Sequence, residues 1–290
     1  MGESKHISGL TRGLNLRRTS NKIAAYGTVL ALIVYVARSV SEQWVVGNPM
    51  TVLEALSSSL VVFVAWAVAR ELDPDHPWPA AVSMLASFIV ALWFVPAALV
   101  VAVASAAVRM ISGTVGRSFT VVDLGIMLIV GLGSGRELAS WSIAILAFVF
   151  LKTAPEVGRL RWWAIGSLTA GFVAGWYGGE LSPINVTTAT AAATGGFLVV
   201  AGIAASSTKV SVRTDARTGP IERKRLAMSR LAAGVIMASA TLLGGFDAMW
   251  EIAPVGVALG VVAVVSLIPV VAGPTSDGLK PRTTSAETAS

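Results

Sequence analysis

The sequence predicts an all-α protein, a polytopic transmembrane helical bundle of about ten spans with the N-terminus and the C-terminus in the cytoplasm. Three observations support this fold class. The composition is strongly apolar, with 54% hydrophobic residues, 13% charged residues and a mean hydropathy of +0.74. Apolar blocks of near-membrane length divide the chain. Lys and Arg residues concentrate in alternate gaps between these blocks, as expected when every second loop faces the cytoplasm.

The predicted spans follow one another with short gaps. A helix that crosses about 30 Å of hydrocarbon at about 1.5 Å per residue needs about 20 apolar residues. Because the bilayer core offers no water to backbone N–H and C=O groups, each span must be helical. Within a membrane domain of residues 23–272, we expect spans at residues 23–40, 50–69, 79–94, 95–110, 119–134, 138–153, 162–178, 185–205, 228–245 and 253–272.

The stretch from Trp78 to Met110 decides the topology, because it fits either one tilted helix or a hairpin around Pro96. With a hairpin, all of the 22 Lys and Arg residues except Arg38 and Arg136 lie on the cytoplasmic side. A single helix would invert every later loop and place most of these residues outside, against the observed bias of cytoplasmic loops. Proline also fits the first turn of a helix, where its missing N–H is not needed. The sequence therefore predicts a hairpin with Pro96 in the first turn of its second helix.

Polar segments flank and interrupt the membrane domain. We expect residues 1–22 to form a basic cytoplasmic segment, residues 206–230 a basic cytoplasmic loop and residues 273–290 a disordered cytoplasmic tail. After Pro220 the loop can become helical and continue into the next span. Its basic residues either anchor the topology or contact anionic lipid head groups. The candidates for lipid contact are Lys209, Arg213, Arg217, Arg223, Lys224 and Arg225.

Two carboxylates fall inside predicted spans, where ionisable residues are candidates for function. Glu54 follows Thr51 by three positions, which is the spacing of a capping box at a helix start, and Asp123 follows a threonine by the same spacing. Glu54 therefore either caps its helix or handles a proton or cation on a substrate pathway. Ser57 and Ser58 follow it at helical neighbour spacing and extend the polar patch.

A second candidate pathway lies in the span at residues 185–205. Thr187, Thr190 and Thr194 recur at helical spacing and share one face. The stripe predicts either a polar pathway for a substrate or close helix packing, in which hydroxyl groups bond across the interface.

The turn after the second span is acidic, although it lies on a basic face. It carries Glu71, Asp73, Asp75 and His76 among three prolines. Oxygen ligands in this number can chelate a hard cation, but the spacing matches no metal loop. A rigid turn is the simpler interpretation, and we expect a salt bridge between this turn and the basic segment at residues 209–230.

The composition limits the chemistry. The chain has no cysteine and two histidines, which argues against thiolate catalysis and against a histidine-rich metal site, so we expect no metal and no cofactor. No ionisable residue lies near the centre of a predicted span, and the sequence therefore favours a protein that is not an enzyme. The net charge of +6 indicates a basic membrane face rather than nucleic-acid binding.

The sequence leaves three functions open. The first is a permease for small molecules or lipids, the second is a membrane scaffold that binds another membrane protein or a second copy of itself, and the third is an enzyme acting on lipid-linked substrates. In size and layout the chain is similar to the drug/metabolite transporter superfamily, which is built from two five-helix repeats, and a division near Gly135 gives two halves of opposite orientation. This layout favours the permease. The basic inner side and the absence of organelle signals favour the bacterial plasma membrane.

Overall fold

The computed structural model describes residues 19–45, 51–114, 186–206 and 221–268, together with positions 16, 120, 122, 123, 125, 126, 129 and 173. Within these residues the chain forms seven helices and no strand, so the predicted all-α class is confirmed there. The predicted spans at residues 119–134, 138–153 and 162–178 lie outside the described residues, apart from those isolated positions. The helices are α1 (Thr19–Val45), α2 (Val52–Leu72), α3 (Trp78–Ala91), α4 (Ala98–Ser112), α8 (Thr188–Ser206), α9 (Arg223–Glu251) and α10 (Ala253–Leu267).

Four helices are long and apolar enough to cross a membrane: residues Thr19–Ser41 of α1, and the whole of α2, α8 and α9. The chain is therefore a membrane protein with several spans. The other three described helices, α3, α4 and α10, contain 14, 15 and 15 residues. At about 1.5 Å per residue they measure roughly 21–23 Å, which is less than the hydrocarbon thickness of about 30 Å. The number of ten spans stays a prediction.

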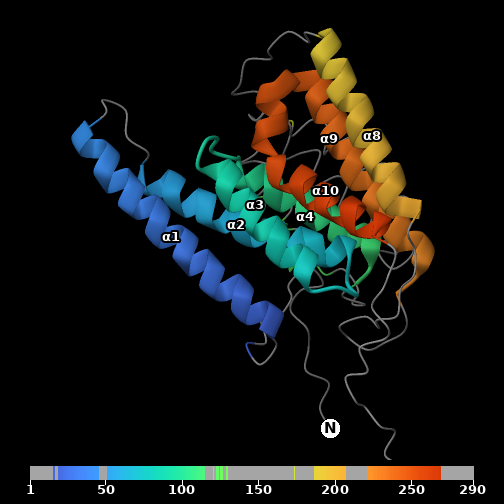
Figure 1. Cartoon of the computed structure of the whole chain (residues 1–290), viewed down its shortest axis with the longest axis horizontal. Coiled ribbons are helices and arrows are strands. Elements are labelled where there is room, and N and C mark those ends of the chain that lie inside the picture. The colour runs from blue at the N-terminus through green and yellow to red at the C-terminus, as the bar shows by residue number, and fades with distance from the viewer. Residues whose placement is uncertain are drawn as a thin grey trace, which may run out of the picture.

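The described helices pack around α2 and α10. α2 contacts α1, α3, α4 and α10, and α10 also contacts α3, α8 and α9. The most extensive contact joins α8 to α9. Figure 1 shows α1 on one flank of the bundle, the α8–α9 pair on the opposite flank and α10 between them.

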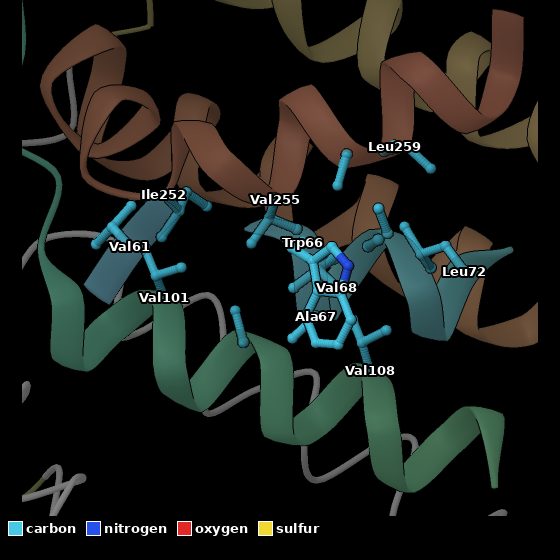
Figure 2. Close-up of a cluster of buried hydrophobic side chains, with 14 of the residues drawn as sticks. Val61, Trp66, Ala67, Val68, Leu72, Val101, Val108, Ile252, Val255 and Leu259 are labelled. Carbon is cyan, nitrogen blue, oxygen red and sulfur yellow. The ribbon is translucent and has the colours of Figure 1, made fainter. Parts of the chain in front are cut away.

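The apolar core lies where α2, α4 and α10 meet, as Figure 2 shows. Its side chains are almost completely removed from solvent, and burial of this kind of apolar surface brings dispersion contacts that hold membrane helices together. The core residues drawn in Figure 2 include Val61, Trp66, Val68 and Leu72 of α2, Val101 and Val108 of α4, and Val255 and Leu259 of α10.

The predicted break between residues 78 and 110 is present, because α3 and α4 are separate helices joined by residues 92–97. That each of them crosses the membrane stays a prediction. The predicted position of Pro96 is wrong by two residues, since α4 begins at Ala98 with Ala97 as its N-cap. The N–H of Ala97 donates to the carbonyl of Glu251 at 3.1 Å. Ala97 has an extended conformation and bonds to α9. Pro96 therefore lies in the turn before the helix and not in its first turn.

Two hydrogen bonds show how α1 runs beside α2 and α3. At one end, the indole N–H of Trp66 in α2 donates to the hydroxyl of Ser20 at the start of α1, at 3.2 Å. At the opposite end, the guanidinium of Arg38 in α1 donates to the carbonyl of Leu92, just after α3. The start of α1 therefore lies beside the second half of α2, and the second half of α1 lies beside the end of α3.

α9 changes direction at Gly245, where the predicted ninth span ends. Gly245 has φ 71° and ψ −157°, a combination that is essentially restricted to glycine. The helix begins at Arg223, shortly after Pro220, and runs without a break into the predicted ninth span. The sequence predicts this continuation.

Candidate functional site

Glu54, the first candidate on the pathway, caps the start of α2. Its carboxylate accepts a hydrogen bond from the backbone N–H of Thr51 at 2.6 Å, and its own N–H donates to the Thr51 hydroxyl at 3.2 Å. This reciprocal pair is the capping box that the spacing predicts. Of the two serines that follow, Ser57 is half-buried and Ser58 is fully buried.

The threonine stripe on α8 is present, and its hydroxyl groups have partners. The N–H of Thr187 donates to the Thr190 hydroxyl at 2.9 Å, and the N–H of Thr190 donates to the Thr187 hydroxyl at 3.1 Å. The Thr194 hydroxyl lies 2.8 Å from the Thr190 carbonyl and 3.3 Å from the carbonyl of Ala238 in α9. These contacts cap α8 and join it to α9, which is the behaviour expected of an interhelical packing surface.

The structure does not bring the candidates on α2 and α8 into one site within its described part. α10 packs against both helices. Glu54 bonds within its own capping box, and Thr194 bonds toward α9. A substrate pathway lined jointly by these two helices is therefore not visible among the described residues.

Three other hydroxyl groups lie inside the bundle without a hydrogen-bond partner among the described residues. They belong to Ser58 of α2 and to Ser83 and Ser87 of α3, here called the interior serines. All three residues have 0% exposed surface. Ser83 and Ser87 were not among the sequence candidates, although their spacing of four residues places both on one face of a helix.

Buried hydroxyl groups elsewhere in the described helices, such as those of Ser59 and Thr241, find a partner within their own helix. Ser59, next to Ser58, donates to the Leu56 carbonyl at 2.8 Å, and Thr241 donates to the Met237 carbonyl at 2.8 Å. Back-bonding of this kind is the ordinary way in which a helix satisfies a hydroxyl. A buried hydroxyl without a partner destabilises a fold by about 1–3 kcal/mol. The interior serines are therefore polar groups that the apolar bundle retains at a cost in stability.

Two of the interior serines, Ser58 and Ser87, lie toward the same end of the bundle. At about 1.5 Å per residue, Ser58 lies about 9 Å from the start of α2. By the same measure, Ser87 lies about 6 Å from the end of α3, whereas Ser83 lies about 7–8 Å from its start. α2 and α3 are consecutive helices joined by a short turn, so the start of α2 and the end of α3 face the same end of the bundle.

The acidic turn between α2 and α3 does not hold its four candidates in one cluster. The Asp73 carboxylate lies 3.0 Å from Nδ1 of His76 and accepts the backbone N–H of His76 at 3.4 Å. Asp75 is half-buried. Glu71 belongs to the last turn of α2, is fully buried and binds α4 instead of the turn.

Glu71 forms a buried ion pair that the sequence analysis did not predict. Its Oε1 atom accepts a hydrogen bond from Nε of Arg109 in α4 at 2.8 Å. Its Oε2 atom accepts the hydroxyl groups of Ser112, at 3.2 Å, and of Thr114. The hydroxyl bonds supply further partners for the carboxylate, which a buried charge requires in addition to its counter-ion.

Two arginines near the start of α9 bind the carbonyl ends of three other helices. Arg230, which is 4% exposed, donates to the Leu72 carbonyl at the end of α2 at 2.8 Å and to the Ala204 carbonyl near the end of α8 at 2.7 Å. Arg225 donates to the carbonyls of Met110 and Ile111 near the end of α4. Cations are favourable at these positions because the carbonyl end of a helix carries partial negative charge.

Gly113 makes room for one of these arginines. It ends α4 in the left-handed conformation, with φ 64°, and a Cβ atom placed there would lie 2.7 Å from Nη2 of Arg225. Glycine both adopts this conformation without strain and lets the guanidinium approach the helix end.

Glu71, Arg109, Arg225 and Arg230 are here called the arginine cluster. Of these, only Arg225 was predicted to meet lipid, and it bonds to protein carbonyls. Arg223 and Lys224 are exposed, whereas the lipid-contact candidates Lys209, Arg213 and Arg217 lie outside the described residues. The predicted salt bridge between the acidic turn and the basic segment stays a prediction, because most of that segment lies outside the described residues.

The described residues contain no group of three or more His, Cys, Asp and Glu side chains able to hold a metal ion. Comparison with known proteins finds no matching family model, no matching curated protein and no matching solved structure. The similarity to the drug/metabolite transporter superfamily therefore rests on layout alone.

Proposed function

We propose that the chain is a permease-like membrane protein that carries small polar molecules or the polar part of a lipid. The observation that carries this proposal is the set of interior serines, whose hydroxyl groups are buried without a partner in the described part of the bundle. A helix normally satisfies such a group through its own backbone. A hydroxyl left unpaired at a cost in stability is available to a polar solute that enters between the helices.

The chemistry of the site favours an uncharged solute. The interior serines are neutral, and the ion pair of the arginine cluster lies at the opposite end of α2, toward its last residue. Hydroxyl groups both donate and accept hydrogen bonds. An uncharged solute can therefore exchange one hydroxyl partner for the next, and no charged side chain is needed to bind it.

The proposal includes the topology of about ten spans, with both termini and the arginine cluster on the cytoplasmic side of a bacterial plasma membrane. Basic residues support this orientation, because Arg223 and Lys224 are exposed beside the cluster. In that position they contact anionic lipid head groups, together with Lys209, Arg213 and Arg217.

A scaffold function is the second candidate, and α1 favours it. This helix packs against α2 and α3 and exposes large apolar side chains on its other face, including Tyr26 at 72%, Leu30 at 61% and Ile33 at 60%. Such a face suits lipid, another membrane protein or a second copy of the chain. No observation among the described residues favours the third candidate, an enzyme acting on lipid-linked substrates.

Uptake into proteoliposomes tests the permease proposal. The purified chain is reconstituted and compared with empty liposomes for entry of a panel of labelled uncharged polar solutes, such as glycerol, sugars and nucleosides. We expect at least one solute to enter faster, and we expect Ser58→Ala and Ser87→Ala to change its rate by about tenfold, a difference of about 1.4 kcal/mol.

Ser59→Ala is the matched control, because Ser59 is a buried neighbour whose hydroxyl bonds within its own helix. This variant should transport like the parent chain. Equal rates for all serine variants and the parent, or no entry above empty liposomes for any solute, would contradict the proposal.

A further inference from the structure

Along α2, the bundle changes from a polar interior at one end to a charged network at the other. Of the interior serines, Ser58 lies near the start of α2 and Ser87 near the end of α3. The arginine cluster lies at the end of α2, where α4 and α8 also end and α9 begins. Between them lies the apolar core of Figure 2, which includes Val61, Trp66 and Val68.

Side chains of the arginine cluster join four helices, α2, α4, α8 and α9. Arg230 of α9 bonds to the carbonyl ends of α2 and α8, and Arg225 of α9 bonds to the carbonyl end of α4. The Glu71–Arg109 pair links α2 directly to α4. By contrast, the helix-to-helix contact between α2 and α9 is small. Packing joins α9 closely to α8 and α4, and polar side chains add the bonds that hold α2 to α9 at this end of the bundle.

We propose that the arginine cluster is the gate at this end of the pathway, and that separation of α9 from the ends of α2, α4 and α8 opens it. This inference rests on the permease function proposed above. The gate consists of the charged cluster at the surface and the apolar core beneath it, which excludes water from the interior serines while the cluster is intact.

The chemistry of the cluster suits a reversible closure. Backbone carbonyls at a helix end accept hydrogen bonds from water as well as from side chains. When α9 moves, water can therefore replace the guanidinium groups of Arg225 and Arg230 at these carbonyls. The Glu71–Arg109 pair is different, because a buried charge that loses its partner is strongly destabilised unless water reaches it. Loss of this pair should thus favour the open, hydrated state.

The absence of cysteine from the natural sequence makes a direct test possible. A single Ser87→Cys substitution introduces a thiol at an interior serine with little change in shape. The chain is placed in sealed membrane vesicles of both orientations, and the rate of labelling by a membrane-impermeant cationic methanethiosulfonate reagent is measured from each side. A separate Ser206→Cys chain, labelled at the exposed end of α8, reports which vesicle orientation presents the arginine cluster.

We expect the thiol at position 87 to react mainly from the side opposite the cluster. Glu71→Gln should raise the labelling rate from the cluster side by about tenfold. The matched control is Glu222→Gln, the same chemical change at an exposed residue near the start of α9, and it should leave the rate unchanged. Arg225→Gln provides a second gate variant if Glu71→Gln does not fold, as judged by its thermal unfolding.

The outcomes separate the gate from the function on which it rests. If position 87 reacts but Glu71→Gln and Arg225→Gln leave labelling from the cluster side unchanged, the cluster is a structural brace and the gate proposal is wrong, although a pathway exists. Rapid labelling from the cluster side in the parent chain also overturns the gate. If position 87 is inert from both sides in every folded variant, both proposals fail.

Discussion

The contact between α8 and α9 depends on one glycine, and its replacement gives a quantitative prediction. A Cβ atom added to Gly234 of α9 would overlap the Cβ of Ala201 in α8 and would lie 3.1 Å from the Phe197 carbonyl oxygen. Both neighbours are attached to, or part of, the α8 backbone, so neither can rotate away. We therefore expect Gly234→Ala to force the two helices apart and to destabilise the fold.

The magnitude follows from two opposing effects. Overpacking of a well-packed interface destabilises by about 1–3 kcal/mol, whereas alanine in place of glycine favours a helix by about 1 kcal/mol. Gly202 on α8 supplies a control, because no heavy atom among the described residues lies within 4 Å of a Cβ added there. The helix-forming gain is common to Gly234→Ala and Gly202→Ala, so the difference between the two variants measures overpacking alone. We expect that difference to be about 1–3 kcal/mol.

The assay is reversible unfolding in mixed micelles, followed by the fluorescence of the chain's nine tryptophans. Both variants and the parent are titrated with denaturing detergent, and the free energy of unfolding is compared at one detergent composition. A difference below about 0.5 kcal/mol between Gly234→Ala and Gly202→Ala would refute the close approach of α8 and α9, since surface substitutions fall within that range.

Three further changes can be measured in the same assay. Arg230→Met should lower the free energy of unfolding by about 3–5 kcal/mol, because it removes two bonds from a buried cation to helix ends, and a loss under 1 kcal/mol would argue against those bonds. Tyr35→Phe should destabilise by about 1 kcal/mol through loss of the bond from the hydroxyl to the Phe88 carbonyl at 2.8 Å, and an unchanged midpoint would count against it. Thr51→Ala should lower stability by about 1 kcal/mol because the α2 capping box is lost, and a gain in stability would contradict that role.

Local features of the fold could be predicted from the sequence because they depend on residues close together in the chain. The threonine–acid spacing at Glu54 predicts a capping box, and the structure contains one. The same spacing at Asp123 gives a bond of 2.8 Å from the Thr120 N–H to the carboxylate. The charge alternation also predicts the break between α3 and α4, because each extra helix reverses the side of every later basic loop.

The arginine cluster could not be predicted, because its bonds join distant residues. Arg225 looks like a residue for lipid head groups when it is seen in a basic loop, yet it bonds to carbonyls more than 100 residues earlier in the chain. A sequence does not show which backbone carbonyl a distant side chain binds, and it does not show which cation pairs with Glu71. Of the interior serines, Ser58 was among the sequence candidates, whereas Ser83 and Ser87 were missed for a related reason. Their spacing in α3 is also that of small residues at a packed interface, and only the structure shows that their hydroxyl groups have no bond among the described residues.

The bond between Arg230 and the end of α2 also bears on how the protein is made. Its two residues are separated by 158 positions, and synthesis at about 5–20 residues per second puts about 8–32 s between their emergence. During that interval the last carbonyls of α2 depend on water or on the insertion machinery. Nascent chains that stop short of residue 230 should therefore be released as substrates for membrane proteases, even though their first four helices are complete.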